Sequence, residues 1–321
     1  MAINTKVGVS GLFKSVEVLR AGKVVRKTGE FTNLITDVGL ARLASPGTGQ
    51  NSCFNYIRVG TGNVPPSPSD LALQDQIAST SVDSNYEGSG GVNLEEGFVW
   101  RRVTWTFEEG AVVGNVSELA TGWDASSSGT IFSRALVRDS EGNPTTITVL
   151  ADEQLRVTWE HRRYWATEDV SGTLVNEGNK GGVYNYRVRA ADVGNWTIGR
   201  PANSGINISN LVGAGLKSRN VTYNYPSELG PIDGFPTGSP SSYSGSTGGG
   251  VAGPSSVSRN IQFSLTQANS SAGISCLVFQ SYYGGTGTGT RHAFQVEFDP
   301  PLIKTSEDVM EIGVQINWAR A

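Results

Sequence analysis

The side chains that could do acid–base or metal chemistry are few in this sequence. It has two histidines, His161 and His292, and two cysteines, Cys53 and Cys276, and they are well separated along the chain. A metal site needs such groups clustered, and neither a CxxC pair nor a disulfide framework occurs. We therefore expect reduced and mostly buried thiols, a structural His161 on the apolar register of its strand, and no metal site.

The carboxylates pair only as sequence neighbours, at Glu95–Glu96 and Glu108–Glu109. Adjacent residues on a strand face opposite sides, so neither pair can share one proton or act on one glycosidic bond. The run GTGTGT (residues 285–290) lacks the following helix that a phosphate-binding loop needs. No G-x-S-x-G elbow and no calcium loop occurs. The sequence therefore predicts a protein that is not an enzyme and that holds no cofactor.

Aromatic side chains remain as candidates for binding. Four of them lie in or next to expected loops: Trp123, Tyr243, Tyr282 and Tyr283. Rings in such positions can stack on a sugar or pack against a partner protein, and ordinary packing at the rim is the competing interpretation. Four others fall on strand registers and are expected in the core: Trp100, Trp105, Trp159 and Trp318.

The composition favours many short strands joined by turns. The chain of 321 residues has 41 glycines and only 17% charged residues, a balance typical of all-β proteins. Its net charge of −4 and the absence of a Lys/Arg-rich run argue against a nucleic-acid surface. No signal peptide and no stretch of transmembrane length is recognisable, so we expect synthesis in a cytoplasm and no membrane insertion.

Local patterns place the first elements. Residues 12–31 predict a hairpin that turns at Ala21–Gly22. Thr36 or Asp37 can cap a short helix that ends before Pro46. A proline-rich loop follows, and it could lead into one helical turn near residues 71–77. The segment FVWRRVTWTF (residues 98–107) alternates strictly and predicts a half-buried antiparallel strand.

The second part of the chain repeats the order of strands in the first. VTWTF (residues 103–107) aligns with IQFSL (residues 261–265), in which Ile261, Phe263 and Leu265 are expected on one apolar face. The strand ending the first half, LRVTWEH (residues 155–161), aligns with IGVQINW (residues 312–318). We expect an all-β protein with one or two short helices. Two antiparallel β-sandwich-like domains, residues 1–166 and 167–321, would arise by duplication. A generic sandwich pattern occurring twice is the competing explanation.

Two Gly/Ser-rich segments are expected to be long surface loops. They are residues 83–96 in the first half and residues 230–258, also rich in proline, in the second. Surface loops are where a neighbouring subunit can be contacted. The hairpin at residues 13–31 is a third candidate contact.

Four segments resemble tail and fibre-associated virion proteins of tailed bacteriophages. They are AGKVVRKTGEFTNLITDVGLARLAS (residues 21–45), YIRVGTGNVPPSPSDLALQDQIAST (residues 56–80), residues 132–164 and the C-terminal residues 293–321. The resemblance covers roughly half of the chain and implies a structural virion component. It transfers no catalytic residue. The chain has no heptads and no collagen-like repeat, so a neck, collar, baseplate or fibre-attachment position fits better than a fibre shaft.

The first functional hypothesis is therefore a structural tail protein located in the virion. It would assemble in several symmetric copies with other tail or neck proteins. The alternative is a receptor-binding module that grips host-surface saccharide through Trp123, Tyr282 and Tyr283. A depolymerising enzyme is a third and weaker hypothesis, since such enzymes need a carboxylate cluster.

Overall fold

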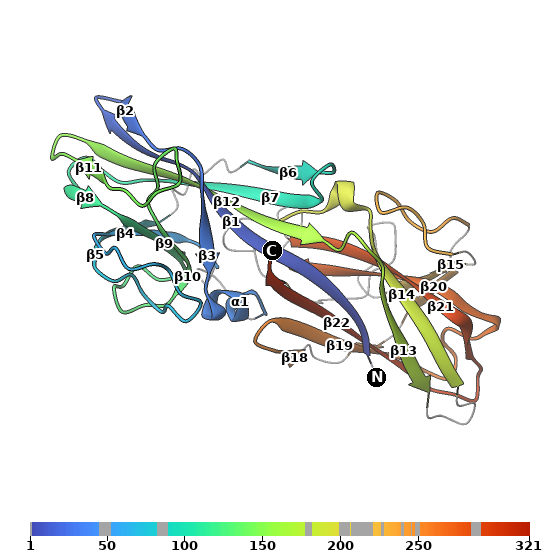
Figure 1. Cartoon of the computed structure of the whole chain (residues 1–321). Coiled ribbons are helices and arrows are strands. Elements are labelled where there is room, and N and C mark those ends of the chain that lie inside the picture. The colour runs from blue at the N-terminus through green and yellow to red at the C-terminus, as the bar shows by residue number, and fades with distance from the viewer. Residues whose placement is uncertain are drawn as a thin grey trace.

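The fold is built almost entirely of β-strands. The computed structural model describes residues 2–44, 53–81, 89–176, 182–198, 206, 221–225, 228–238, 241–244, 246–247, 251–283 and 290–321. Figure 1 shows an elongated body with the first half of the chain at one end, the second half at the other, and both termini near the middle. The expected all-β, sandwich-like fold with a short helix is confirmed.

The first half contains an antiparallel series in the order β3-β10-β9-β4-β5 and a second group in which β7 lies between β12 and β6. The strands are β3 (Phe31–Ile35), β4 (Tyr56–Gly60), β5 (Gln76–Ser81), β6 (Gly90–Asn93), β7 (Phe98–Thr106), β9 (Glu118–Gly122), β10 (Ile131–Leu136) and β12 (Gln154–Trp165). A small separate pair is formed by β8 (Gly114–Val116) and β11 (Ile147–Val149).

The second half contains a six-stranded sheet in the order β13-β14-β21-β20-β15-β16, and a further pair, β19 and β22. These strands are β13 (Val170–Asn176), β14 (Gly182–Ala191), β15 (Val221–Tyr225), β16 (Ser241–Ser244), β19 (Ser256–Phe263), β20 (Ser270–Tyr283), β21 (Thr290–Lys304) and β22 (Met310–Arg320). Two short strands, β17 (Ser246–Thr247) and β18 (Val251–Ala252), pair with β19, and one 3₁₀ turn, η1 (Val193–Asn195), follows β14.

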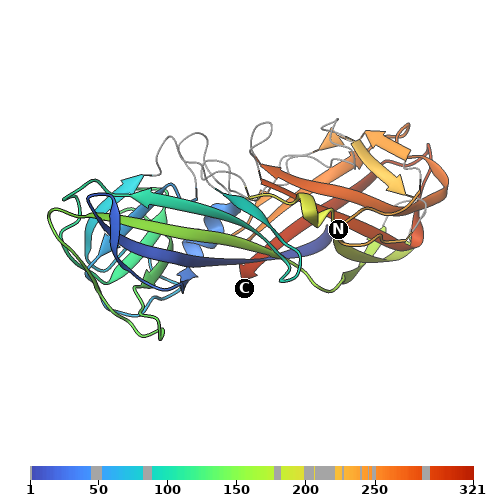
Figure 2. The same ribbon diagram turned by 90° about the horizontal axis from the view of Figure 1, so that it is seen from above.

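The N-terminal strand joins the two halves. Strand β1 (Ala2–Arg20) is antiparallel to β12 along Val7–Leu19 and parallel to β22 along Ala2–Val9. Figure 2 shows β1 and β12 running together along the first half towards the middle of the molecule. Because β1 hydrogen-bonds to strands of both halves, the main sheet is continuous from β6 to β19. The domain division at residue 166 stays a prediction.

The order of strand pairing recurs in the two halves. The series β3-β10-β9-β4-β5 of the first half has the counterpart β14-β21-β20-β15-β16, and the pair β7–β12 has the counterpart β19–β22. The register differs, since Val103 pairs with Trp159 whereas its counterpart Ile261 pairs with Ile312 and not with Ile316. The shift is an even number of residues, so the same face stays inward. Common descent of the halves stays a prediction.

The predicted hairpin and helix form as their sequences indicate. The turn between β1 and β2 (Lys23–Lys27) has positive φ at Ala21 and Gly22, 49° and 75°, which matches the twist of a tight hairpin. Helix α1 (Asp37–Ala44) begins after Thr36, whose hydroxyl accepts a hydrogen bond from the Gly39 N–H at 2.9 Å. Thr36 is therefore the N-cap residue.

Three local expectations were wrong. Residues 71–75 are irregular and residues 76–81 form β5, so no helical turn occurs there. Leu265, expected on the apolar face of β19, lies beyond the end of the strand and is 47% exposed. Neither of the two expected surface loops is a loop throughout, because residues 83–96 contain β6 and residues 230–258 contain β16, β17, β18 and the start of β19. Strand pairing with β7, β15 and β19 orders these short pieces.

The core runs through both halves. The alternating residues of β7 and β12 are buried as expected, including Trp105 and Trp159, and Trp318 of β22 is also buried. Trp100 is an exception, because it lies half-buried on the outer face of the main sheet beneath the guanidinium of Arg102. None of the described helices is long and apolar enough to span a membrane.

Candidate functional site

The four aromatic residues selected from the sequence do not come together. Trp123 follows β9 in the first half, whereas Tyr243 lies on β16 and Tyr282 and Tyr283 lie at the end of β20 in the six-stranded sheet. The three tyrosines are thus on strands rather than in loops, and their side chains lie outside the described part of the structure. A role of these four residues in binding a partner or a glycan stays a prediction.

Trp123 is packed against its surroundings. Its ring is half-buried against the core, and the guanidinium carbon of Arg42 lies 4.8 Å from the ring centroid. The fully buried side chain of Arg58 fixes the loop after Trp123. It donates hydrogen bonds to the carbonyls of Asp124, Gly129 and Thr130. One face of the Trp123 ring is therefore already covered by a cation, which leaves less of it for stacking on a sugar.

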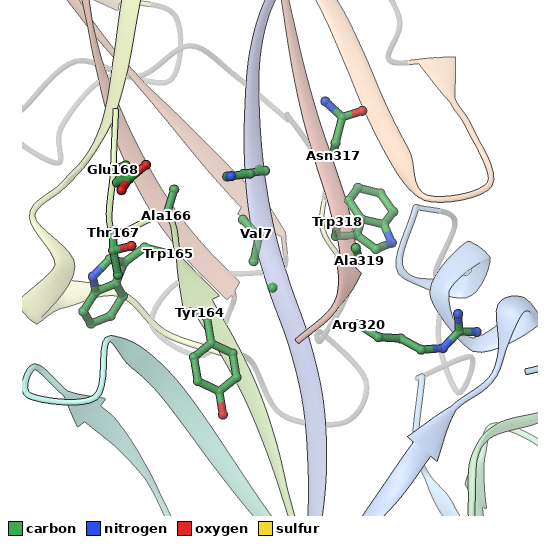
Figure 3. Close-up of a pocket in the computed structure, with 12 residues that line it drawn as sticks. Val7, Tyr164, Trp165, Ala166, Thr167, Glu168, Asn317, Trp318, Ala319 and Arg320 are labelled. Atoms are coloured by element: carbon green, nitrogen blue, oxygen red, sulfur yellow. The ribbon is translucent and has the colours of Figure 1, made fainter. Parts of the chain in front are cut away.

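A groove on the main sheet lies where β1 passes between the ends of β12 and β22 (Figure 3). It has a volume of about 350 Å³, and in Figure 3 residues 164–168 lie on one side of β1 and residues 317–320 on the other. Gly8 forms part of its floor, since a Cβ there would lie only 3.2 Å from the Tyr164 Cβ. The exposed charged groups at its rim are Lys6 and Glu168.

The polar groups of this groove are mostly engaged within the protein. The Ser10 hydroxyl lies 3.3 Å from the Tyr164 hydroxyl and donates to it. The Asn317 side-chain amide donates to the Thr5 carbonyl at 3.2 Å, and the Arg320 guanidinium contacts Asp37. The lining thus offers a polar surface to a ligand or a neighbouring chain, but its side chains form no pair of nucleophile and base.

A second hollow of about 540 Å³ lies between the β6–β7 hairpin and the segment around η1. The Trp100 ring lies beside this hollow, but Gly91 and the Arg102 guanidinium already pack against it. A Cβ on Gly91 would lie 3.2 Å from the ring, and the Arg102 guanidinium carbon is 4.5 Å from the ring centroid. This arrangement favours a packed surface over a free aromatic platform.

The outer face of β7 and β12 carries a row of arginine and aromatic side chains. Glu160, 2% exposed, accepts hydrogen bonds from Arg102 at 2.8 Å and Arg162 at 2.7 Å. The Arg162 guanidinium carbon also lies 4.4 Å from the ring centroid of Phe98. Two cations share one carboxylate here, so the row is rigid and carries excess positive charge.

A buried ionic network fixes the proline-rich loop of the first half. The fully buried carboxylate of Glu118 accepts hydrogen bonds from Arg134 at 2.7 Å and from the backbone N–H groups of Gly62 at 3.1 Å and Asp75 at 2.8 Å. Asp70 also pairs with Arg134, at 2.8 Å. Burial alone would lower the pKa of Arg134, but Asp70 and Glu118 outweigh it and raise the pKa. The role of this network is structural.

Both histidines lie in the interior, on strands of different halves. His161 on β12 packs against Trp159, Phe54 and Phe132, with its ring centroid 5.5 Å from that of Trp159. His292 on β21 packs edge-on against Trp196 at 4.6 Å. Arg163, also fully buried, donates from Nε to His161 Nε2 at 3.2 Å. The expectation of a structural His161 fits this packing.

The two cysteines are free and buried, as the sequence predicts. Burial is the largest cause that raises the pKa of Cys276, to about 12, and the charge of Glu297 adds to it. A thiol of that pKa is not a nucleophile at neutral pH. Within the described ranges, no three His, Cys, Asp or Glu side chains are placed to hold one metal ion.

Several strands leave an edge without a partner among the described strands. Two of them are β5, which pairs with β4, and β13, which pairs with β14. Neither strand contains a charged residue or a proline, and Ile77 and Val175 on them are 41% and 50% exposed. By contrast, the edge strand β2 carries Lys23, Arg26 and Lys27. Charged residues on an edge oppose pairing with another chain, so the uncharged edges of β5 and β13 suit such pairing better than the edge of β2.

Sequence reasoning missed the surfaces that depend on distant pairing. That β5 and β13 have one partner each among the described strands follows from which strands pair, and the groove follows from β1 lying between β12 and β22. The available signals were the uncharged run VSGTLVN (residues 170–176) and the alternating N-terminus.

Comparison with protein-family models, with curated proteins and with solved structures finds no match to this chain.

Proposed function

We propose that this chain is a structural component of a tailed-bacteriophage tail, at a neck, collar, baseplate or fibre-attachment position, and that it assembles in several symmetric copies. It would be made in the host cytoplasm and incorporated into the virion beside other tail proteins. The resemblance of residues 21–45, 56–80, 132–164 and 293–321 to virion proteins supports the tail assignment.

The observation that carries the assembly proposal is the pair of uncharged strand edges on opposite halves. In Figure 1, β5 lies at one end of the elongated body and β13 towards the other. An edge strand offers a row of unpaired backbone N–H and C=O groups, to which another chain can add a strand. Two different edges on one chain permit a head-to-tail contact, which closes into a ring or continues as a filament.

The strand β13 gives the sharper test, because its surroundings are well defined. Thr173 on β13 pairs with Asn185 on β14, and the Thr173 hydroxyl donates to the Asn185 side-chain oxygen at 3.4 Å. Both side chains are exposed on the same face. A lysine at residue 173 therefore puts a charge on the edge strand β13, whereas a lysine at residue 185 puts the same charge on the neighbouring strand β14.

The experiment compares the wild-type chain, Thr173→Lys and Asn185→Lys by light scattering after size exclusion and by negative-stain microscopy. We expect the wild type and Asn185→Lys to form oligomers of defined size and Thr173→Lys to remain smaller. Monomeric wild-type protein at high concentration, or equal assembly of both variants, would refute assembly through β13.

The tail assignment is tested separately by mass spectrometry of intact particles against tail-less heads. The chain should be found in the former and be absent from the latter, and its presence in heads alone would refute the assignment. If the purified monomer bound a host saccharide on a glycan array and formed no oligomer, the receptor-binding alternative would replace the structural role.

A further inference from the structure

The interior contact between the two halves contains an unusual group of polar side chains. His161 and Arg163 project from β12 in the first half, and His292 projects from β21 in the second. All three are 0% exposed. The chain has only these two histidines, and most buried positions in this fold are apolar. Such a group is costly to bury, so its presence at one contact calls for a physical explanation.

The rings on both sides are enclosed by aromatic residues. His292 packs on Trp196, and Trp196 in turn packs edge-on against Trp165 at the end of β12, 5.6 Å between ring centroids. His161 packs on Phe54, which follows Cys53 in sequence. The Trp165–Trp196–His292 contacts join the end of β12 to β21 of the six-stranded sheet, whereas His161 packs on rings of the first half. A charge on His292 is therefore placed where β12 meets the six-stranded sheet, and a charge on His161 lies two residues from Arg163 on the same strand.

The charges around the imidazoles oppose protonation. Burial is the largest cause holding the pKa of His161 well below 6.5; the charges of Arg163 and His292 act in the same direction, and a hydrogen bond with the Ser10 backbone acts against them. Burial and then Arg163 hold the pKa of His292 well below 6.5. Two further titratable groups lie close by: Arg101 on β7, which pairs with His161 across the ladder, and Cys53, whose charge acts on Arg163. Neither ring nitrogen of His292 has a hydrogen-bond partner within the described part of the chain.

We propose that His161, Arg163 and His292 form an acid-sensitive contact between the two halves. When the imidazoles become protonated, this contact opens and the main sheet separates from the six-stranded sheet. At neutral pH both rings are neutral and pack as flat hydrophobic groups. In acid, two imidazolium ions would lie near the Arg163 guanidinium at positions that are 0% exposed, and separation lets solvent reach all three cations.

The direction of the pH dependence follows from linkage. The closed contact binds protons more weakly than the open one, so it is fully favoured above about pH 6.5, the ordinary pKa of histidine, and loses stability as the pH falls below that value. Each histidine contributes up to a tenfold rise in the opening equilibrium constant per pH unit, and the two together up to about a hundredfold.

The two cysteines provide a probe and its control in the same chain. Cys53 lies beside the cluster, whereas Cys276 is equally buried in a separate apolar cluster with Val278. Dithiodipyridine labels thiols in mild acid, and peptide mapping separates the two sites. Dividing each labelling rate by that of the urea-unfolded chain at the same pH removes the effect of thiol ionisation and leaves the accessibility.

We expect the accessibility of Cys53 to rise by about ten- to a hundredfold per unit between pH 6.5 and 5, while that of Cys276 stays constant. His161→Gln and His292→Gln should each reduce the dependence to at most tenfold, and the double variant should abolish it. Constant Cys53 accessibility in the wild type, an unchanged dependence in the double variant, or a parallel rise at Cys276 would overturn the proposal.

A measurement on the wild type alone covers the case in which the variants fold poorly. Nuclear magnetic resonance of the labelled imidazoles reports their protonation directly. We expect neither imidazole to titrate at pH 6.5 while Cys53 stays protected. An imidazole that gains its proton at its ordinary pKa with the contact still closed would refute the proposal.

Discussion

Removal of the Glu118 carboxylate should be among the most destabilising single changes in the first half. Glu118 is 0% and Arg134 is 3% exposed, and the two are joined by hydrogen bonds of 2.9 and 2.7 Å. In Glu118→Ala the Arg134 cation stays buried with Asp70 as its remaining carboxylate partner. Removing one member of a buried ion pair costs about 3–5 kcal/mol, because the other charge is left uncompensated.

Backbone groups add to this loss. The N–H groups of Gly62, Gln74 and Asp75 donate to Glu118 at 3.1, 3.2 and 2.8 Å. Each donor left without an acceptor in the interior costs about 1–3 kcal/mol, although a relaxed loop admits water and reduces this. We therefore expect Glu118→Ala to lower the free energy of unfolding by about 4 kcal/mol, as the combined effect of both losses.

The assay is urea unfolding followed by tryptophan fluorescence at pH 7, run as a double-mutant cycle with Arg134→Ala. Lys14→Ala is the matched control, because the Lys14–Glu30 pair is a surface ion pair whose loss should cost under about 1 kcal/mol. The coupling energy between Glu118 and Arg134 should exceed about 1 kcal/mol. A loss for Glu118→Ala as small as that for Lys14→Ala, or additive effects in the cycle, would refute this account of the network.

Two further predictions concern groups that the fold encloses. Cys53 and Cys276, both 0% exposed, should react with a thiol reagent at pH 8 only after unfolding, and fast labelling of the native chain would show that the packing around them is wrong. Gly11→Ala should cost about 1–3 kcal/mol, because its Cβ would lie 2.8 Å from Trp159 Nε1 and closer still to Asn33 Oδ1. Gly194→Ala, where nothing lies within 4 Å of the added Cβ, is the control, and equal thermal stability of the two variants would contradict the steric argument.

The sequence predicted the features that depend on neighbouring residues. Alternation along β7 and β12 placed Trp105 and Trp159 in the core, because successive side chains of a strand face opposite sides. The hairpin at Ala21–Gly22 and the helix capped by Thr36 were also predicted from short segments. Trp100 was wrongly expected in the core, because the same alternation places it with Arg102 on the face opposite Trp105.

The features that were missed depend on contacts between distant residues. Glu118 and Arg134 look like surface charges in a single sequence, and only the loop that covers β9 and β10 makes them interior. The free edges of β5 and β13 depend on pairing order. The burial of His292 could not be predicted, because its neighbour Trp196 is far away in sequence and no local pattern links the two.

The position of β1 has a consequence for how the two halves depend on each other. In the first half, β12 lies between β7 and β1, both antiparallel to it. In the second half its counterpart β22 pairs antiparallel with β19, but its other edge is covered by the N-terminal end of β1, in parallel. In the six-stranded sheet, β13 pairs with β14 and β16 pairs with β15, and neither has a second partner among the described strands. One N-terminal strand thus pairs with strands of both halves, and because it occupies one edge of β22, the second half has its unpaired edges in the six-stranded sheet rather than at β22.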